Sequence, residues 1–158
     1  MLRLGNPIGI ALAAWVALAS PPALAGPPTL QVFKSPACEC CEKWVEHLRA
    51  HGFAVEVTDV PDVERIKREH RVPERVASCH TALIGEYFVE GHVPAADVRR
   101  LLKERPRIAG LAVPGMPVGS PGMEGPDPEP FDVLAVDSEG QVKVFSSHHP
   151  GVPGAPKP

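Results

Sequence analysis

The sequence predicts an α/β domain, and three observations lead to this class. Segments with the alternating pattern of strands and segments with the 3.6-residue pattern of helices follow one another along the chain. The hydrophobic share of 44% is enough to build a core, which excludes a disordered chain. The net charge of −3 lacks the basic excess needed to bind phosphate backbones, so nucleic acid is not expected as a partner.

The first 25 residues have the pattern of a secretory signal peptide. Arg3 is the only charged residue before Lys34, a mostly apolar run extends from Ile8 to Ala19, and an A-x-A motif ends at Ala25. The run is shorter than the roughly 20 apolar residues that span a bilayer, which disfavours the alternative of an uncleaved anchor. We therefore predict a signal peptide over residues 1–25 and a mature chain, without a membrane anchor, that works outside the cytoplasm, where disulfides persist.

The first part of the mature chain predicts strand, helix, strand and helix. Thr29–Lys34 contains β-branched and aromatic residues, and Phe53–Thr58 alternates apolar and polar residues, as strands do. Between these strands, residues at i, i+3, i+4 and i+7 form one helical face: Cys41, Trp44, Val45 and Leu48. A short polar helix is expected from Pro61, and its charged run Glu64–Arg71 is expected to face solvent.

The second part predicts two strands, a helix and a long loop. Ala82–Ile84 and Tyr87–Glu90 flank a tight turn, and a third helix extends from Pro94 to Pro106. The segment 114–130 contains six prolines and four glycines, which excludes a helix or a central strand. Such a long loop in a compact domain is usually functional or disordered.

A final hairpin is predicted from Val133–Val136 and Val142–Phe145. The complete order is a βαβαββα core followed by the Pro/Gly-rich loop and this hairpin, which is the order of a thioredoxin-like domain. We predict one such metal-binding domain over residues 26–146 and a disordered tail over residues 147–158, where proline and glycine are again frequent.

Three of the four cysteines lie where the first strand passes into the first helix. Cys38 and Cys41 have Cys-x-x-Cys spacing, and Cys40 lies between them. Unpaired N–H groups and the positive end of the helix dipole stabilise thiolates at this point, and thiolates are both nucleophiles and metal ligands. In a thioredoxin-like fold the segment before the third strand faces this helix end, so Cys79 and His80 are expected to join the cluster.

Three kinds of chemistry are compatible with these cysteines. Structural disulfides are disfavoured, because the adjacent Cys40 and Cys41 could pair only with strain and because very small closed loops stabilise little. Thiol–disulfide exchange through Cys38 and Cys41 is the second alternative. Binding of a soft metal is the third. It is favoured because thiol–disulfide exchange through Cys38 and Cys41 would leave Cys40 and Cys79 without a role.

The spacing favours copper over zinc. Successive residues diverge by about 100° around a helix, so Cys40 and Cys41 are not expected to converge on one tetrahedral ion. Thiolates that bridge several Cu(I) ions use divergent sulfurs, whereas a single closed zinc site fits the cluster less well. Copper, bound mainly as Cu(I), is therefore the expected metal.

The motifs around these residues resemble those of a known family. The runs Lys34–Trp44, Ser78–Ala82, Glu90–Pro94 and Gly110–Glu124 are together similar to the CopG-type copper-resistance family of small exported bacterial proteins. The resemblance extends over about residues 29–146. It implies a thioredoxin-like fold, a periplasmic location and a role in copper tolerance, with redox interconversion of Cu(I) and Cu(II) as a further implied activity.

The resemblance also implies the ligands and the partners. Carried over by motif, the metal-binding cysteines are Cys38, Cys40, Cys41 and Cys79, and His80 is expected as an auxiliary ligand. Copper ions and other periplasmic copper-handling proteins are the implied partners, and a copper-delivery module that is not an enzyme is a further alternative.

Two departures from related patterns bear on these expectations. Glu39 stands where the family often has glycine, which brings a carboxylate beside the thiolates. Thioredoxins have a cis-proline before the third strand, whereas this chain has Cys79-His80-Thr81 there. The missing proline weakens the oxidoreductase alternative, because that proline helps to dock substrate peptides.

Other side chains are given secondary roles. Met116 and Met123, in two Pro-Gly-Met units, offer soft thioethers, and they are assigned either to a lid over the site or to packing beneath the loop. His92 is expected to fix the turn before Pro94. The remaining histidines are expected in solvent or in the tail: His47, His51, His70, His148 and His149.

Overall fold

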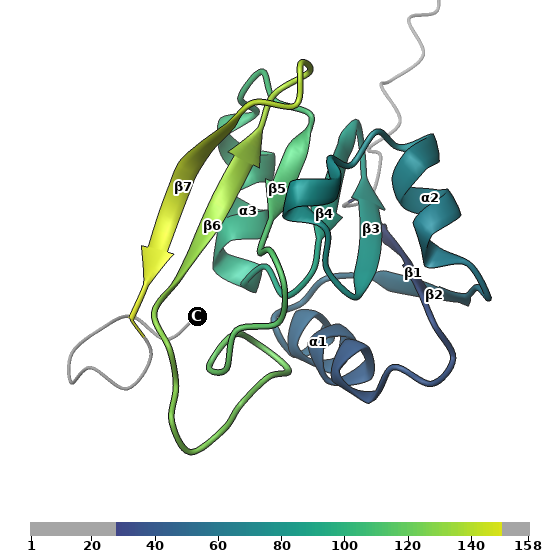
Figure 1. Ribbon diagram of the computed structural model, residues 1–158, viewed down its shortest axis with the longest axis vertical. Coiled ribbons are helices and arrows are strands. Elements are labelled where there is room, and N and C mark those ends of the chain that lie inside the picture. The colour runs from purple at the N-terminus through teal and green to yellow at the C-terminus, as the bar shows by residue number, and fades with distance from the viewer. Residues whose placement is uncertain (1–27, 150–158) are drawn as a thin grey trace, which may run out of the picture.

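The computed structural model describes residues 28–149, which form one mixed β-sheet with helices on both faces (Figure 1). The α/β class predicted from the sequence is confirmed. The predicted signal peptide and residues 150–158 of the predicted tail lie outside the described residues. Within residues 28–149, no helix is both long enough and apolar enough to cross a bilayer.

The elements follow in the order β1 (Leu30–Lys34), α1 (Glu39–Ala50), β2 (Val55–Asp59), α2 (Val63–Glu69), a 3₁₀ turn η1 (Glu74–Val76), β3 (His80–Ile84), β4 (Tyr87–Glu90), α3 (Ala95–Glu104), β5 (Gly110–Ala112), β6 (Phe131–Val136) and β7 (Val142–His148). The predicted order of elements is observed through α3, and the predicted hairpin is formed by β6 and β7.

The sheet has the strand order β2-β1-β3-β4-β5-β6-β7. The pairs β1–β2 and β4–β5 are parallel, and the other neighbouring strands are antiparallel. The strand β5 adds an element beyond those predicted, because its three residues are too few to show an alternating pattern. Gly110 in β5 lies so close to Phe88 that a side chain would not fit there.

Two apolar clusters lie on opposite faces of the sheet. The larger one joins Trp44 and Leu48 of α1 and Leu101 of α3 to inward residues of the central strands, for example Ala82. The smaller one includes Phe88 and lies beneath the chain that follows α2. Because Cβ atoms alternate along a strand, successive residues of β3 and β4 reach different clusters.

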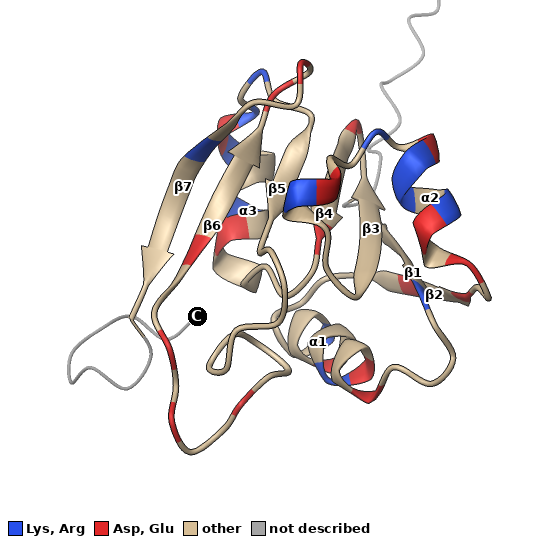
Figure 2. Cartoon of the chain, in the orientation of Figure 1, with Lys and Arg blue, Asp and Glu red and all other residues tan. Residues whose placement is uncertain are grey.

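The helix α2 differs from its prediction in one respect. It begins at Val63 after Asp62, whose carboxylate accepts a hydrogen bond from the Arg65 backbone N–H at 3.0 Å. Its surface carries charges of both signs, as Figure 2 shows. Lys67, which was expected in solvent, is instead buried against the sheet. Its partner there is Glu90.

The strand β7 continues through Ser147 and His148, two residues into the segment assigned to the tail. His148 was expected to be mobile, but its Nε2 atom lies 2.7 Å from a carboxylate oxygen of Asp97 in α3. Its ring stacks on Phe131, with 5.0 Å between ring centroids. These contacts attach the last strand to the domain, and only tertiary structure could have revealed them.

His47 also differs from its expected role in solvent. Its Nε2 atom accepts a hydrogen bond of 3.1 Å from the backbone N–H of Ala95, the first residue of α3. An N–H group at the start of a helix has no partner within the helix, so the His47 side chain satisfies it. The ring is half-buried, and this burial, with a smaller effect of His51, lowers the pKa of His47 to about 4.

We expect His47 to make the fold sensitive to acid. The unfolded chain binds a proton at His47 near the ordinary pKa of 6.5, whereas the folded chain does so only near 4. The free energy of unfolding should therefore fall as the pH falls from about 6.5 to 4. The contribution of this half-exposed ring should be about 1 kcal/mol, because water screens it.

Urea unfolding of the wild type and His47→Gln at pH 7 and pH 4.5 measures this contribution. Glutamine does not titrate in this range, and its amide oxygen can still accept from the Ala95 N–H. The variant should lose less stability in acid than the wild type. Equal acid losses in the two proteins would contradict the role assigned to His47.

Candidate metal centre

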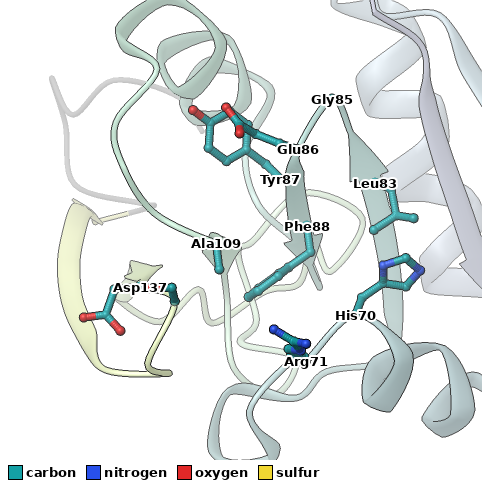
Figure 3. Close-up of a pocket in the computed structure, with 10 residues that line it drawn as sticks. His70, Arg71, Leu83, Gly85, Glu86, Tyr87, Phe88, Ala109 and Asp137 are labelled. Carbon is teal, nitrogen blue, oxygen red and sulfur yellow. The ribbon is translucent and has the colours of Figure 1, made fainter.

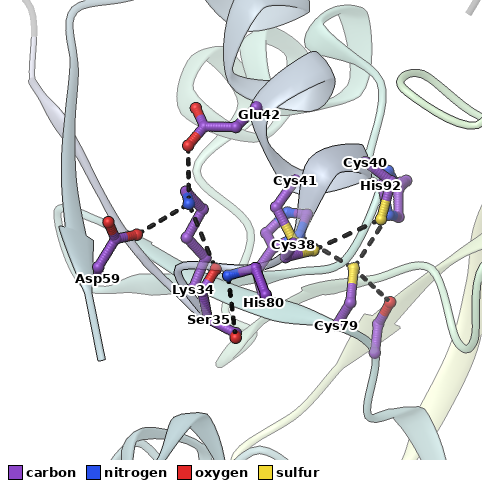
Figure 4. Close-up of a disulfide and its surroundings, with 12 residues drawn as sticks. Lys34, Ser35, Cys38, Cys40, Cys41, Glu42, Asp59, Cys79, His80 and His92 are labelled. Carbon is purple, nitrogen blue, oxygen red and sulfur yellow. Dashed lines mark hydrogen bonds and ion pairs between the residues drawn. A yellow bond between two sulfur atoms is a disulfide. The ribbon is translucent and has the colours of Figure 1, made fainter. Parts of the chain in front are cut away.

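The pairing of the strands brings three distant segments to one end of the sheet (Figure 4). In the antiparallel pair β1–β3, Lys34 at the end of β1 lies opposite His80 at the start of β3. In the pair β3–β4, Thr81 lies opposite Glu90 at the end of β4. The chain continues from these points into Cys38–Cys41 and His92, so these residues meet the segment that carries Cys79.

The four cysteines form one cluster. Their Sγ atoms all lie within 4.8 Å of one another, although Cys79 is far from the others in sequence. Cys38 and Cys41 form a disulfide, and Cys40 and Cys79 are free thiols. The Cys40 sulfur lies 3.5 Å from that of Cys38. The structure therefore brings together the four predicted cysteine ligands.

The sulfur atoms of Cys40 and Cys41 lie within 4.8 Å of each other, and the expectation that they do not converge on one tetrahedral ion stays a prediction. Both lie in the first turn of α1, but Cys38 precedes the helix in extended backbone, with φ −86° and ψ 93°. Its sulfur contacts Cys40 and is bonded to Cys41, so it closes the gap between two side chains that diverge around the helix.

Two histidines extend the cluster at Cys79. The Cys79 sulfur lies 3.2 Å from Nδ1 of His80 and 3.0 Å from Nε2 of His92. These three residues are a second group whose ligand atoms all lie within 4.8 Å of one another. His92, which was expected to fix a turn and whose place in the site was left open, thus lies beside Cys79. One sign of this role was present in the sequence: His92 lies in Glu90–Pro94, one of the four runs that resemble the same family as the cysteine motifs.

The hydrogen bonds define how these groups are protonated. Nδ1 of His92 lies 2.8 Å from the carbonyl oxygen of Pro121, and because a carbonyl only accepts, Nδ1 carries the proton. Nε2 of His92 is then an acceptor for the Cys79 thiol. Since that thiol has one hydrogen, Nδ1 of His80 must donate to the sulfur. Nε2 of His80 is left as a lone pair.

This lone pair on His80 has no partner in the described part of the chain. His80 is completely buried, and its Nε2 is the one side-chain nitrogen or oxygen atom among the described buried residues that forms no hydrogen bond. A buried polar group without a partner is costly and calls for an explanation. A metal ion is a suitable partner for a neutral imidazole nitrogen.

Burial keeps this end of the site electrically neutral. It lowers the pKa of His80 well below 6.5, with smaller electrostatic effects from the neighbouring His92 and Lys67. It also lowers the pKa of His92. Burial, and then the neighbouring Cys40 thiol, raise the pKa of Cys79 to about 12. The imidazoles are thus in their metal-binding form, whereas Cys79 must lose a proton to a bound metal.

A buried lysine lies on the other side of the cysteines. The ammonium group of Lys34 forms ion pairs with Glu42 at 2.7 Å and with Asp59 at 2.8 Å. Hydrogen bonds to Asp59 and then to Glu42 raise the pKa of Lys34. Because Glu42 follows Cys41 in α1, the two ion pairs connect the first turn of α1 to the ends of β1 and β2.

The Pro/Gly-rich loop packs directly on the site. Its carbonyl oxygen at Gly115 accepts from the Ser78 hydroxyl, beside Cys79. Further along, Gly122 has a φ of +84°, and a Cβ there would lie 2.8 Å from both the Cys40 carbonyl oxygen and the Trp44 amide nitrogen. The two Pro-Gly-Met units thus contact the segments that carry Cys79 and Cys40. Met116 is 51% exposed.

Two further features are the backbone before β3, which bears on the oxidoreductase alternative, and a cavity away from the cysteines. Among residues 28–149 no peptide bond is cis, and Cys79 stands immediately before β3. A cavity of about 260 Å³ lies at the opposite end of β3 and β4, around their connecting turn (Figure 3). It is lined in part by His70, Arg71 and Asp137, and none of its lining residues is a cysteine. The sulfur chemistry is therefore confined to the other end of the sheet.

Fold and site together define a small α/β protein with a cysteine- and histidine-rich candidate metal centre at one end of its sheet. A family model described as "Protein of unknown function, DUF411" matches residues 76–123. No curated protein matches the sequence.

Two solved structures are similar over almost their whole length. "Copper resistance protein copG- Form 2" is 43% identical with a TM-score of 0.74, and the match covers 78% of this chain and 99% of that one. "Copper resistance protein copG- Form 1" is 44% identical with a TM-score of 0.73, and the match covers 79% and 99%. The chain belongs to the family of the copper resistance protein CopG, as the motifs predicted.

We expect Gly122→Ala to destabilise the protein more than Gly115→Ala. Both glycines have positive φ, +84° and +67°, so alanine is strained at each by about 1 kcal/mol. Only at Gly122 would the new methyl group also meet backbone atoms of α1, since the space around Gly115 is open. Urea unfolding should show at least twice the loss for Gly122→Ala. Equal losses would contradict tight packing of the loop on α1.

Proposed function

We propose that this protein binds Cu(I) in the periplasm and thereby contributes to copper tolerance. The observation that carries this proposal is the meeting of four sulfur atoms within 4.8 Å of one another. Thiolates are soft ligands that select Cu(I). The names of the two solved relatives, copper resistance proteins with 43% and 44% identity, support copper as the metal.

The proposed ligands are Cys38, Cys40, Cys41 and Cys79, with nitrogen ligands from His80 and His92. Four sulfurs with two imidazoles exceed the needs of one Cu(I) ion, so we propose that thiolates bridge more than one ion. Cys79 is the shared residue, because it belongs both to the sulfur group and to the group with the histidines. Met116 and Met123 stay candidates for further thioether ligands.

Copper binding at this site requires a prior reduction. The Cys38–Cys41 disulfide offers no thiolate, so a dithiol reductant must first deliver two electrons and two protons to it. The reduced thiols then lose their protons as copper binds. The oxidised and copper-bound forms therefore exclude each other at Cys38 and Cys41.

Several finer properties belong to this proposal. They are cleavage of the signal peptide over residues 1–25, the thioredoxin-like character of the core, interconversion of Cu(I) and Cu(II), and exchange of copper with other periplasmic copper-handling proteins. The order β2-β1-β3-β4 in the sheet, with the cysteines at the start of α1, supports the thioredoxin-like assignment.

One observation favours the alternative of a thiol–disulfide oxidoreductase. Cys38 and Cys41 are paired as a disulfide at a helix N-terminus, which is the arrangement that such enzymes use. That function needs neither Cys40 nor Cys79. Substitution of Cys40 or Cys79 therefore distinguishes the two functions, because only the proposed copper binding requires these residues.

We expect the reduced protein to take up Cu(I) against a competing chromophoric chelator under anaerobic conditions. Cys40→Ser and Cys79→Ser should each lower the affinity by about 100-fold, since each removes a ligand. His92→Gln should lower it by about tenfold. His51→Gln, which changes an exposed histidine of the same helix face as His47, is the matched control and should bind like the wild type.

Absence of uptake by the reduced wild type would refute copper binding. Uptake that is unchanged in Cys40→Ser and Cys79→Ser would refute the proposed ligands. Reduction of a model disulfide substrate at an undiminished rate by these two variants would support the oxidoreductase alternative instead.

A further inference from the structure

A buried ion pair lies directly behind the candidate metal centre. The ammonium group of Lys67 is 2.9 Å from Oε1 of Glu90, and the side chains are only 3% and 0% exposed. Removing two charges from water is costly, so such a pair is weak evidence for a stabilising role. Its retention in the interior calls for another explanation.

The carboxylate of Glu90 holds both ends of the segment that carries Cys79. Its Oε1 accepts a hydrogen bond of 2.6 Å from the Ser78 backbone N–H. Its Oε2 accepts one of 2.6 Å from the Thr81 hydroxyl. Ser78 and Thr81 immediately flank Cys79 and His80, so one carboxylate fixes the residues on both sides of the two ligands.

Lys67 fixes the carboxylate in turn. Its ammonium group contacts Oε1 of Glu90 at 2.9 Å and donates to the Thr81 hydroxyl at 3.2 Å. The hydroxyl oxygen thus accepts from Lys67 while it donates to Glu90, and all three side chains are buried. A network in which each member is satisfied has a single arrangement.

The backbone around Ser78 leaves no room for an alternative position. A Cβ on Gly91, which follows Glu90 and has a φ of +69°, would lie 2.5 Å from the Ser78 hydroxyl oxygen. The Gly91 N–H also bonds the His80 carbonyl oxygen at 3.0 Å. Hence the segment with Cys79 packs against the segment that leads to His92, and Glu90 joins the two.

We propose that Glu90, oriented by Lys67, is a positioning residue that holds the Cys79 sulfur against the thiols at the start of α1. This inference rests on the proposed copper site, and it assigns a role to Lys67, one of the two buried residues of α2. Neither Glu90 nor Lys67 touches the metal in this role. They act through the Ser78 backbone N–H and the Thr81 hydroxyl.

The test compares four variants with the reduced wild type at one fixed pH. Glu90→Ala removes the acceptor for the Ser78 N–H. Thr81→Val removes the hydroxyl that donates a hydrogen bond to the Glu90 carboxylate. The double variant Lys67→Met/Glu90→Gln removes both charges but keeps an amide oxygen for the Ser78 N–H. Leu101→Ala, a fully buried change in α3, controls for general loss of stability.

Two measurements are made on each variant. The first is Cu(I) affinity by competition with the chromophoric chelator. The second is the rate at which Cys79 is alkylated relative to Cys40 in the metal-free protein, measured by mass spectrometry of peptides. The second measurement does not depend on copper, so it tests the positioning role even if the proposed function fails. Thermal unfolding provides the loss of stability for comparison.

We expect Glu90→Ala to lower Cu(I) affinity about tenfold and to raise the relative alkylation of Cys79 several-fold, with smaller changes in Thr81→Val. The double variant should differ from the wild type, but by less than Glu90→Ala, because the amide oxygen can still accept from the Ser78 N–H although Lys67 no longer orients it. Leu101→Ala should change neither quantity despite its lower melting temperature.

Wild-type affinity and wild-type alkylation in folded Glu90→Ala would overturn the inference. Equal changes in Leu101→Ala would also overturn it, since they would show a general effect of stability. If Glu90→Ala does not fold, Thr81→Val decides, and unchanged values there would refute the positioning role. Absence of Cu(I) binding by the wild type, with the expected alkylation changes, would refute only the proposed function.

Discussion

The antiparallel pairing of β3 with β1 is the constraint on which the candidate site depends. It places the start of β3 beside the end of β1, with His80 opposite Lys34. Cys79 precedes β3 and the other cysteines follow β1, so their meeting is a consequence of strand direction. A shift of this register by one residue would turn the side chains of β3 to the opposite face and separate the sulfurs.

Buried charge surrounds the sulfur cluster and is satisfied within the protein. Lys34 is paired with two carboxylates on the side of α1, and Lys67 is paired with Glu90 behind Cys79. Between these two ion-paired groups, the Nε2 atom of His80 alone lacks a partner among the described buried side chains. The described interior thus leaves unused bonding capacity on His80, whose other ring nitrogen lies 3.2 Å from the Cys79 sulfur.

The element order, the helix that starts at the cysteines and the long Pro/Gly-rich loop were predictable, because each rests on local patterns. The contributions of His92, Lys67 and His148 were not. A helical wheel shows that Lys67 shares a face with charged neighbours. It does not show that Lys67 forms a buried ion pair with Glu90 of β4. Likewise, the angular divergence of Cys40 and Cys41 is a local fact, whereas the sulfur of Cys38 that joins them depends on how the chain enters α1.

The sequence by itself determined the class of fold and the chemistry that is available: soft thiols at a helix N-terminus, with Cys79 and His80 in a distant motif. These follow from periodicity and residue type, which act over a few neighbours. Only the tertiary structure decided which of these groups meet, that Cys38 and Cys41 are paired, and that His92 completes the group around Cys79. The physical reason is that strand register and side-chain burial depend on contacts between residues far apart in the chain.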